Sequence, residues 1–400
     1  MKEKIITRNF VCTFLAQLCL ALVMYTLMST ITEHVTKLGA TTTIAGLVSG
    51  VYVVGGLFSR IYSGGAMQKY GWKKIAVIFS IIHFVSSIMY SFSGNIALLL
   101  VVRFIHGIGF GATMNAIMLI AMSSMPKSRY GEATGYFMMS ASLGVAIGPF
   151  VGGIIYDTFG GQGCFTVASI LSLLVVFGVL FSETRSIDPY FQNRSIHENR
   201  VQKSDKVSEK ATVFDHFLER KAIPISLSIF CLCFGYAALM SFYRLYAQST
   251  DLRKEFSYFF LIYAAVLLVS RPAVGKLQDK IGDNAICYPC MAGQVIGLIL
   301  LAWKPCMATI IICAVCGALG YGTLNSVLNV IVNRQVTDEE RSRTVTTYWA
   351  FSDAGVGIAP AILGKVASAF GYPALYFAAA AISFLAIPIY WLVQSRKTVD

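Results

Sequence analysis

A few charged residues lie inside long apolar stretches of the sequence, where a charge is unfavourable. Asp353 is the acid nearest the middle of such a stretch, and five basic residues share this environment: Arg60, Arg103, Arg244, Arg271 and Lys365. A charge at the centre of a bilayer costs about 2.5–3.5 kcal/mol on insertion scales, so such residues are seldom placed there without a function. Because a carboxyl group removed from water binds a proton more readily, Asp353 is the first candidate for proton coupling. The alternative is a static ion pair with a nearby Arg.

Three further titratable or charged side chains are candidates for proton coupling. Arg103 is expected to face the interior of a helix bundle, where it stabilises a nearby carboxylate or binds substrate, or else bonds to backbone carbonyls. His106 follows three residues later and is either a group that titrates near neutral pH or a packed core residue. Glu33, beside His34 near the end of the first apolar stretch, is the weakest candidate of the three.

The composition defines the elements that must position these residues. The chain has 400 residues, of which 56% are hydrophobic and 13% charged, with a mean hydropathy of +0.66. Soluble domains are about 45–50% apolar and 25% charged, so the sequence predicts an all-α integral membrane protein. Windows of about 19 residues indicate twelve transmembrane segments. They are residues 10–32, 43–66, 75–93, 96–125, 130–157, 162–182, 223–247, 254–278, 284–303, 306–333, 341–368 and 373–394.

A polar stretch divides the segments into two sets of six. We expect an N-terminal half at residues 1–182, a cytoplasmic central loop at 183–222 and a C-terminal half at 223–400. If the N-terminus is cytoplasmic, 23 of the 27 loop Lys and Arg residues lie on the cytoplasmic side, as the positive-inside rule requires. The sequence thus predicts a multi-pass plasma-membrane protein with both termini in the cytoplasm. The net charge of +12 follows from this topology and from contact with anionic lipid of the bilayer, and no nucleic-acid partner is expected.

An internal repeat relates the two halves. One shift of 211 residues, without gaps, fits from the second segment to the fifth. It places Tyr52 on Tyr263, Ser59-Arg60 on Ser270-Arg271, Gly64 on Gly275, Gly71 on Gly282, Gly144 on Gly355, Pro149 on Pro360, and Phe159-Gly160 on Phe370-Gly371.

Residues 275–282 read Gly-Lys-Leu-Gln-Asp-Lys-Ile-Gly, which resembles the G-x-L-x-D-R/K-x-G signature of major facilitator transporters. Parallel six-helix repeats are the architecture of that family. The resemblance implies twelve helices in two pseudo-symmetric halves, with Asp279 holding the inside face shut. The first-half copy has Gln68 where the family has Asp. We assign ten residues to this gate: Arg60, Gly64, Gln68, Lys69, Gly71, Arg271, Gly275, Asp279, Lys280 and Gly282.

Arg60 and Arg271 each lie one turn before a copy of this motif, which favours a gating or packing role. We expect them to contact helix C-termini or acids of the same side. Those acids are Glu132, Asp338, Glu339 and Glu340.

Two other motifs strengthen the resemblance. Arg103-Phe-Ile-His106-Gly107-Ile-Gly109 resembles the R-x-x-x-G-x-G pattern, whose Arg is implicated in proton transfer in that family. Residues 144–153 resemble G-x-x-x-G-P-x-x-G-G, the signature of its drug and metabolite antiporters, through Gly144, Gly148, Pro149, Gly152 and Gly153. The glycines allow close helix approach and Pro149 bends the helix, as Pro360 is expected to do in the second half. The direction of transport implied, export, rests on the resemblance.

In this fold the first, fourth, seventh and tenth helices line a central cavity. Polar and aromatic residues of those segments are therefore the candidates for substrate binding. They are Gln17, Tyr25, Asn115, Tyr236, Tyr243, Asn325, Asn329 and Asn333. The last three lie at i, i+4 and i+8 on one helix face, directed either to the cavity or to another helix.

Taken together, these features predict a secondary transporter, not an enzyme, that exports a small organic molecule or drug in exchange for protons by alternating access. A proton-coupled uptake symporter for an anionic or zwitterionic metabolite is the alternative, motivated by the surplus of buried Arg. A sensor or a membrane lipid enzyme is a third class, but no cluster of catalytic residues supports an enzyme. No cofactor is expected, and the Cys-x-x-Cys pairs at 287–290 and 313–316 lack a neighbouring His and predict no metal site. One chain supplies a complete pathway, so a monomer is expected.

Overall fold

A computed structural model describes residues 4–126, 129–184, 219–250, 252–334, 336 and 338–395. Across these ranges the secondary structure is entirely helical. The elements are α1 (Arg8–Lys37), α2 (Thr42–Tyr70), α3 (Trp72–Met89), η1 (Tyr90–Phe92), α4 (Ile96–Ser123), α5 (Tyr130–Phe181), η3 (Arg220–Ala222), α9 (Ile223–Gln248), α10 (Arg253–Ile281), α11 (Asn284–Trp303), α12 (Met307–Gly317), the π-helix η4 (Ala318–Thr323), α13 (Leu324–Asn333), α14 (Asp338–Phe384) and α15 (Ala386–Ser395).

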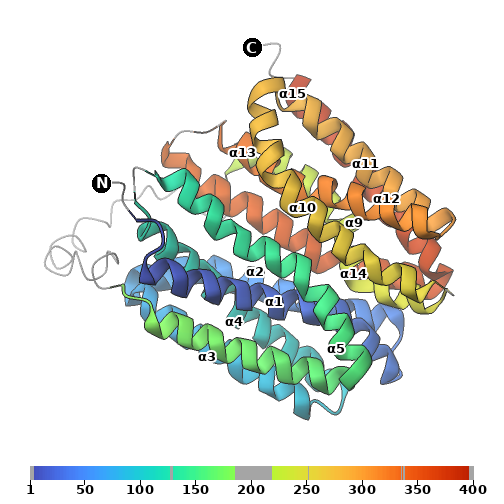
Figure 1. Cartoon of the computed structure of the whole chain (residues 1–400), viewed down its shortest axis with the longest axis horizontal. Helices are drawn as coiled ribbons and strands as arrows, with labels where there is room; N and C mark the ends of the chain where they lie inside the picture. The colour runs from blue at the N-terminus through green and yellow to red at the C-terminus, as the bar shows by residue number, and fades with distance from the viewer. Residues whose placement is uncertain are drawn as a thin grey trace, which may run out of the picture.

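Within the described ranges, nine helical stretches are long and apolar enough to cross a membrane, which agrees with a multi-pass membrane protein. Two of the helices, α5 with 52 residues and α14 with 47, each cover two predicted segments. Gly160 in α5 and Gly371 in α14 have non-helical backbone angles, with φ of 68° and 83°. Figure 1 shows α5 turning back on itself. The count of twelve separate spans stays a prediction.

Local signals explain where several helices begin and end. The side chains of Thr7, Thr41 and Asn95 accept hydrogen bonds from the first turns of α1, α2 and α4. Gly71 ends α2 with φ of 87°, and its partner in the repeat, Gly282, ends α10 with φ of 84°. Since side chains disfavour this backbone region, glycine is required at both tight turns. The repeat noted in the sequence therefore extends to the backbone at Gly71 and Gly282, and also at Gly160 and Gly371.

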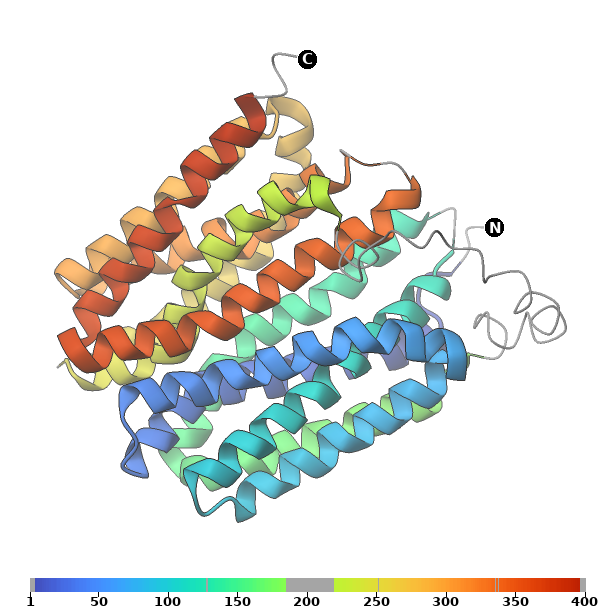
Figure 2. The ribbon, with the colours of Figure 1, turned by 180° about the vertical axis from the view of Figure 1, so that it is seen from behind.

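The helices form two bundles that lie side by side (Figures 1 and 2). In one bundle α1 packs on α5, and α4 packs on α2 and α3; in the other, α9 packs on α14, and α11 on α12. In the described ranges the bundles meet through α2 with α14, α1 with α9, α5 with α10 and, to a lesser extent, α2 with α9. A site between the bundles therefore lies among these six helices.

The contact between α2 and α14 is close at one end only. Two glycines of α2 allow the close approach because they have no side chain. A Cβ atom on Gly46 would overlap the carbonyl oxygen of Pro360, and one on Gly50 would overlap that of Gly357. Near the start of α2, Thr43 Oγ1 lies 3.0 Å from Ser368 Oγ. Figure 2 shows the two helices drawing apart toward the end at which the N-terminus lies. We call this end the predicted inner end, and the opposite end, around Lys37, the predicted outer end.

Candidate functional site

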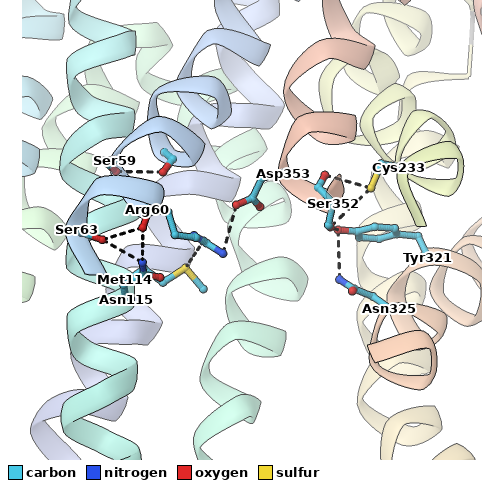
Figure 3. A network of polar contacts seen from close by, with 11 residues as sticks. Ser59, Arg60, Ser63, Met114, Asn115, Cys233, Tyr321, Asn325, Ser352 and Asp353 are labelled. Carbon is cyan, nitrogen blue, oxygen red and sulfur yellow. Dashed lines mark hydrogen bonds and ion pairs between the residues drawn. The ribbon is translucent and has the colours of Figure 1, made fainter. Parts of the chain in front are cut away.

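An ion pair joins the two bundles where α2 and α14 begin to separate. Arg60 Nη1 of α2 lies 3.3 Å from Asp353 Oδ2 of α14. The side chains are 16% and 19% exposed, so both are largely withdrawn from solvent. Figure 3 shows the two side chains pointing toward each other from their helices. Arg60 thus contacts Asp353, because its side chain crosses to α14; the side chains of the loop acids Glu132, Asp338, Glu339 and Glu340 lie outside the described part of the structure.

Uncharged groups of α4, in the first bundle, contact Arg60 and the backbone around it. Asn115 of α4 donates from Nδ2 to the Arg60 carbonyl at 3.3 Å and to Ser63 Oγ at 3.1 Å. Arg60 Nη2 lies 3.5 Å from the sulfur of Met114 (Figure 3). Asn115, predicted to line a cavity, therefore fixes the α2 backbone at Arg60. Met114 had no signal in the sequence that set it apart from a core residue.

On the other side of the pair, a polar network continues into the second bundle. Ser352, the residue before Asp353, contacts Tyr321 Oη at 3.3 Å and accepts from Cys233 Sγ through its carbonyl at 3.3 Å. Asn325 Nδ2 donates to Tyr321 Oη at 3.4 Å, as drawn in Figure 3. Tyr321 lies in the π-helix η4, a rare geometry that is common at functional sites. The network therefore links Asp353 to α9, η4 and α13.

A second group of charges joins the bundles at the predicted outer end. Arg244 of α9 donates from Nε to Glu33 Oε2 of α1 at 2.9 Å and from Nη2 to Asp157 Oδ1 of α5 at 2.6 Å. Lys37 Nζ contacts the other oxygen of Glu33 at 3.0 Å. His34 packs edge-on against Phe165 and is not part of this network. We call Glu33, Lys37, Asp157 and Arg244 the outer ion network.

A cavity of about 350 Å³ lies beside the outer ion network. Pro149 and Gly153 of the predicted antiporter motif line it, as does Tyr243. A Cβ atom on Gly153 would lie 2.7 Å from Arg244 Nη1, so the missing side chain makes room for the guanidinium group. Gly144, Gly148 and Gly152 lie against Ala21, Tyr25 and Thr26 of α1. The motif therefore packs α5 on α1 and leaves space for Arg244.

Arg103 lies inside the first bundle and not between the bundles. Its side chain is fully buried, with Nε donating to the Val48 carbonyl at 3.3 Å and Nη1 to Tyr90 Oη at 3.4 Å. The guanidinium group also lies over the ring of Tyr52, 4.5 Å from its centre. His106 Nδ1 lies 2.8 Å from Tyr90 Oη. The contacts found for Arg103 in the described ranges include no carboxylate, which matches the backbone-bonded alternative.

The other predicted cavity residues are spread over several places. Tyr236 stacks on Tyr321 with ring centres 4.0 Å apart, beside the central network. Asn325 also accepts from Tyr348 of α14, so this member of the Asn stripe faces another helix. Asn333 donates to Asn329 at 2.8 Å. Gln17 is buried on α1, with Oε1 lacking a hydrogen-bond partner. Tyr243 lies at the predicted outer end against Phe259, with ring centres 4.3 Å apart.

The predicted gate motifs are only partly described. Lys69 and Lys280 are exposed at the predicted inner end, and no atom lies within 4 Å of a Cβ built on Gly64. The side chains of Gln68, Arg271 and Asp279, and the surroundings of Gly275, lie outside the described part of the structure, as do residues 185–218 of the central loop.

The long apolar helices and the fold define an integral membrane protein whose two bundles are joined by charged contacts. A model of the Major Facilitator Superfamily matches residues 13–307 and 289–399, so the chain belongs to this family of transporters, which are not enzymes.

Similar proteins include transporters named for drug resistance. The chain is 25% identical to the multidrug resistance protein MdtG of Rahnella sp., over 86% of this chain and 83% of the relative. It is 26% identical to the multi-drug resistance efflux pump PmrA of Streptococcus pneumoniae, over 84% and 82%. Among solved structures, a bacterial homologue of the human lysosomal transporter Spinster, described as inward-facing and unoccupied, matches with a TM-score of 0.75 at 13% identity, over 98% of both chains. That identity supports the fold alone.

Proposed function

We propose that this protein exports a small organic molecule across the plasma membrane in exchange for protons. The names of MdtG and PmrA support export, and the Gly-Pro motif on α5 supports antiport. The two bundles would act as the two halves of an alternating-access transporter, with both termini in the cytoplasm and one chain sufficient for transport.

The observation that carries the proposal is the Arg60–Asp353 ion pair. It is a charged contact between the bundles, and it lies where the close packing of α2 and α14 ends. A proton on Asp353 removes the negative charge of the pair, so protonation weakens one of the links between the bundles. Asp353 is therefore our proposed proton-coupling residue, and Arg60 is its partner.

The outer ion network suits the role of a gate that opens and closes during the cycle. Its members come from α1 and α5 in one bundle and from α9 in the other, so separation of the bundles at this end must break the contacts of Arg244. We assign Glu33 to this gate and not to proton coupling, because Arg244 and Lys37 contact both of its oxygens.

Alternating access then gives a cycle for export. Substrate enters from the cytoplasm and displaces the contact between Arg60 and Asp353. The outer ion network opens and releases substrate outside, and a proton then binds Asp353. The proton gradient supplies about 2.3 kcal/mol per charge for each 100 mV of membrane potential, which drives the return to the inward-facing state.

Proton flux in proteoliposomes tests this function. The full-length protein is reconstituted with an internal pH-sensitive dye, and gradients of organic cations, zwitterions and anions are imposed in turn. We expect a substrate gradient to drive protons in the opposite direction, and Asp353→Asn to lower this flux by about 100-fold, because the proton site is lost. Glu183→Gln is the matched control, since this acid is exposed and belongs to neither charged contact between the bundles, so its loss is expected to change flux about fivefold or less. Protons moving together with substrate would overturn antiport in favour of uptake.

A further inference from the structure

The Arg60–Asp353 pair is incompletely bonded within the described parts of the chain. Arg60 Nε is buried and has no hydrogen-bond acceptor. Asp353 uses Oδ2 for its contact with Arg60, and no contact of Oδ1 is found in the described parts of the chain. A single nitrogen–oxygen contact of 3.3 Å is long for a charge-assisted bond, which is usually about 2.7–2.9 Å.

The outer ion network provides the comparison within the same molecule. There Arg244 binds two carboxylates at 2.9 and 2.6 Å, and both oxygens of Glu33 have cationic partners. The central pair is therefore loosely bonded, although both of its members are largely withdrawn from solvent. Charged groups in such surroundings are usually well paired, so the remaining bonding capacity points to a ligand.

The charge of the pair restricts that ligand. Arg60 and Asp353 together carry no net charge, so a ligand that inserts between them must satisfy one cation and one anion. A ligand with a single charge satisfies one partner and leaves the other without a counter-ion, which is strongly unfavourable away from water. A ligand with a carboxylate and an ammonium group close together satisfies both.

We propose that the transported molecule is a zwitterion whose anionic group is bound by Arg60 and whose ammonium group is bound by Asp353. The inference rests on the transport function proposed above and adds the substrate class. The surroundings also favour an apolar or aromatic body, because the sulfur of Met114 lies on one side of the pair and the stacked Tyr236 and Tyr321 lie on the other.

This charge class fixes the direction of coupling. A zwitterion needs the charged form of Asp353 for its ammonium group, so substrate and proton compete for one carboxylate, as antiport requires. A simple anion on Arg60 would instead bind best when Asp353 is protonated, which gives symport. The other ionisable groups around Asp353 are Arg60 of α2, Cys233 of α9 and Tyr321 of η4. Asp353 is the carboxylic acid among them.

Binding to the purified full-length protein in detergent tests the substrate class without a membrane gradient. Three probes share one skeleton: phenylalanine, the cation phenethylamine and the anion 3-phenylpropanoate. We expect phenylalanine to bind at least about tenfold more tightly than either analogue, because it alone satisfies both charges. Its affinity is expected to fall as the pH is lowered, by up to about tenfold per unit, because one proton competes.

Variants of the two residues test which of them binds the carboxylate of the ligand and which binds its ammonium group. Asp353→Asn is expected to remove the pH dependence and to lower phenylalanine affinity to that of 3-phenylpropanoate. Arg60→Gln is expected to lower it to that of phenethylamine. Glu183→Gln is the control and keeps both affinity and pH dependence, because this exposed acid belongs neither to the central pair nor to the outer ion network. Proton release on binding, measured by calorimetry in buffers of different ionisation enthalpy, must disappear in Asp353→Asn alone.

Several outcomes would overturn the substrate class. They are equal or tighter binding of a singly charged probe, binding by none of the three probes, or a pH dependence that survives Asp353→Asn. The proposed export function fails separately. If zwitterions bind with proton release but are not exchanged for protons in proteoliposomes, the proposed export function is wrong and the proposed binding site stands. If singly charged compounds are exchanged for protons, the export function stands and the proposed substrate class is wrong.

Discussion

The burial of a charged side chain, and not only the length of its ion pair, decides how much that residue contributes to the stability of the folded protein. In the outer ion network the contact of Arg244 with Asp157 is shorter than that with Glu33, at 2.6 against 2.9 Å. The Asp157 side chain, however, is 68% exposed, whereas that of Glu33 is 3% exposed. An exposed ion pair contributes about 0–1 kcal/mol, while removal of one partner from a buried pair costs about 3–5 kcal/mol. Glu33 should therefore dominate the network.

We expect Glu33→Gln to lower the stability of the folded protein by about 3 kcal/mol, since Arg244 and Lys37 lose their shared carboxylate. Asp157→Asn should cost about 1 kcal/mol or less. Unfolding in mixed micelles of increasing SDS content, followed by circular dichroism, measures both. An equal loss in the two variants would contradict the assignment by burial.

The sequence predicted single residues better than it predicted their partners. Arg60 and Asp353 were both recognised, because a charge inside an apolar segment is conspicuous. Their contact was not, because it depends on how α2 crosses α14, and the two residues are almost 300 positions apart in the chain. His83 on α3 lies 4.1 Å from His106 between ring centres, yet nothing in its own segment distinguished it. Partners on other helices follow from packing, which the one-dimensional pattern does not contain.

At the scale of helices, glycine positions determine how closely the bundles approach. The motif on α5 predicted one small-residue face, and this face packs on α1 at Gly144 and Gly148. A second such face, Gly46 and Gly50 on α2, belongs to no motif and was missed, although it meets Pro360 and Gly357 of α14. Without a side chain at these positions, backbone atoms of α2 and α14 come into direct contact.

Gly50→Ala is the sharpest test of this helix contact. Its methyl group would overlap the Gly357 carbonyl, so α2 and α14 must move apart at the predicted outer end. We expect transport to fall by at least about tenfold with expression retained, because backbone overlap costs about 1–3 kcal/mol. Gly135→Ala is the matched control, since no atom lies within 4 Å of its added Cβ. Alanine favours helix by about 1 kcal/mol, so the control should be neutral or slightly stabilising. Comparable transport in both variants would show that close approach at Gly50 has no role.

At the scale of the molecule, the contacts between the bundles that the described residues make lie mostly toward one end. Thr43 with Ser368, Gly46 with Pro360 and the outer ion network lie at the predicted outer end, and the Arg60–Asp353 pair follows deeper along α2. The sequence predicted two bundles from the internal repeat, and hydropathy located most helices within a few residues. It did not predict which end is closed, because a transporter with alternating access adopts both states with one sequence.

Cross-linking at the closed end tests whether these contacts must open. The hydroxyl oxygens of Thr43 and Ser368 are 3.0 Å apart, so cysteines at both positions should form a disulfide. We expect oxidised Thr43→Cys/Ser368→Cys protein to lose transport by at least about 100-fold and to regain it in reductant, because the bundles cannot separate at this end. Phenylalanine binding in detergent should persist, since the inward-facing site stays accessible. Each single cysteine variant is a control for the ten native cysteines, and none should respond to the oxidant. Undiminished transport by the fully cross-linked protein would mean that substrate does not leave between α2 and α14, and the alternating-access cycle proposed for this protein would be wrong.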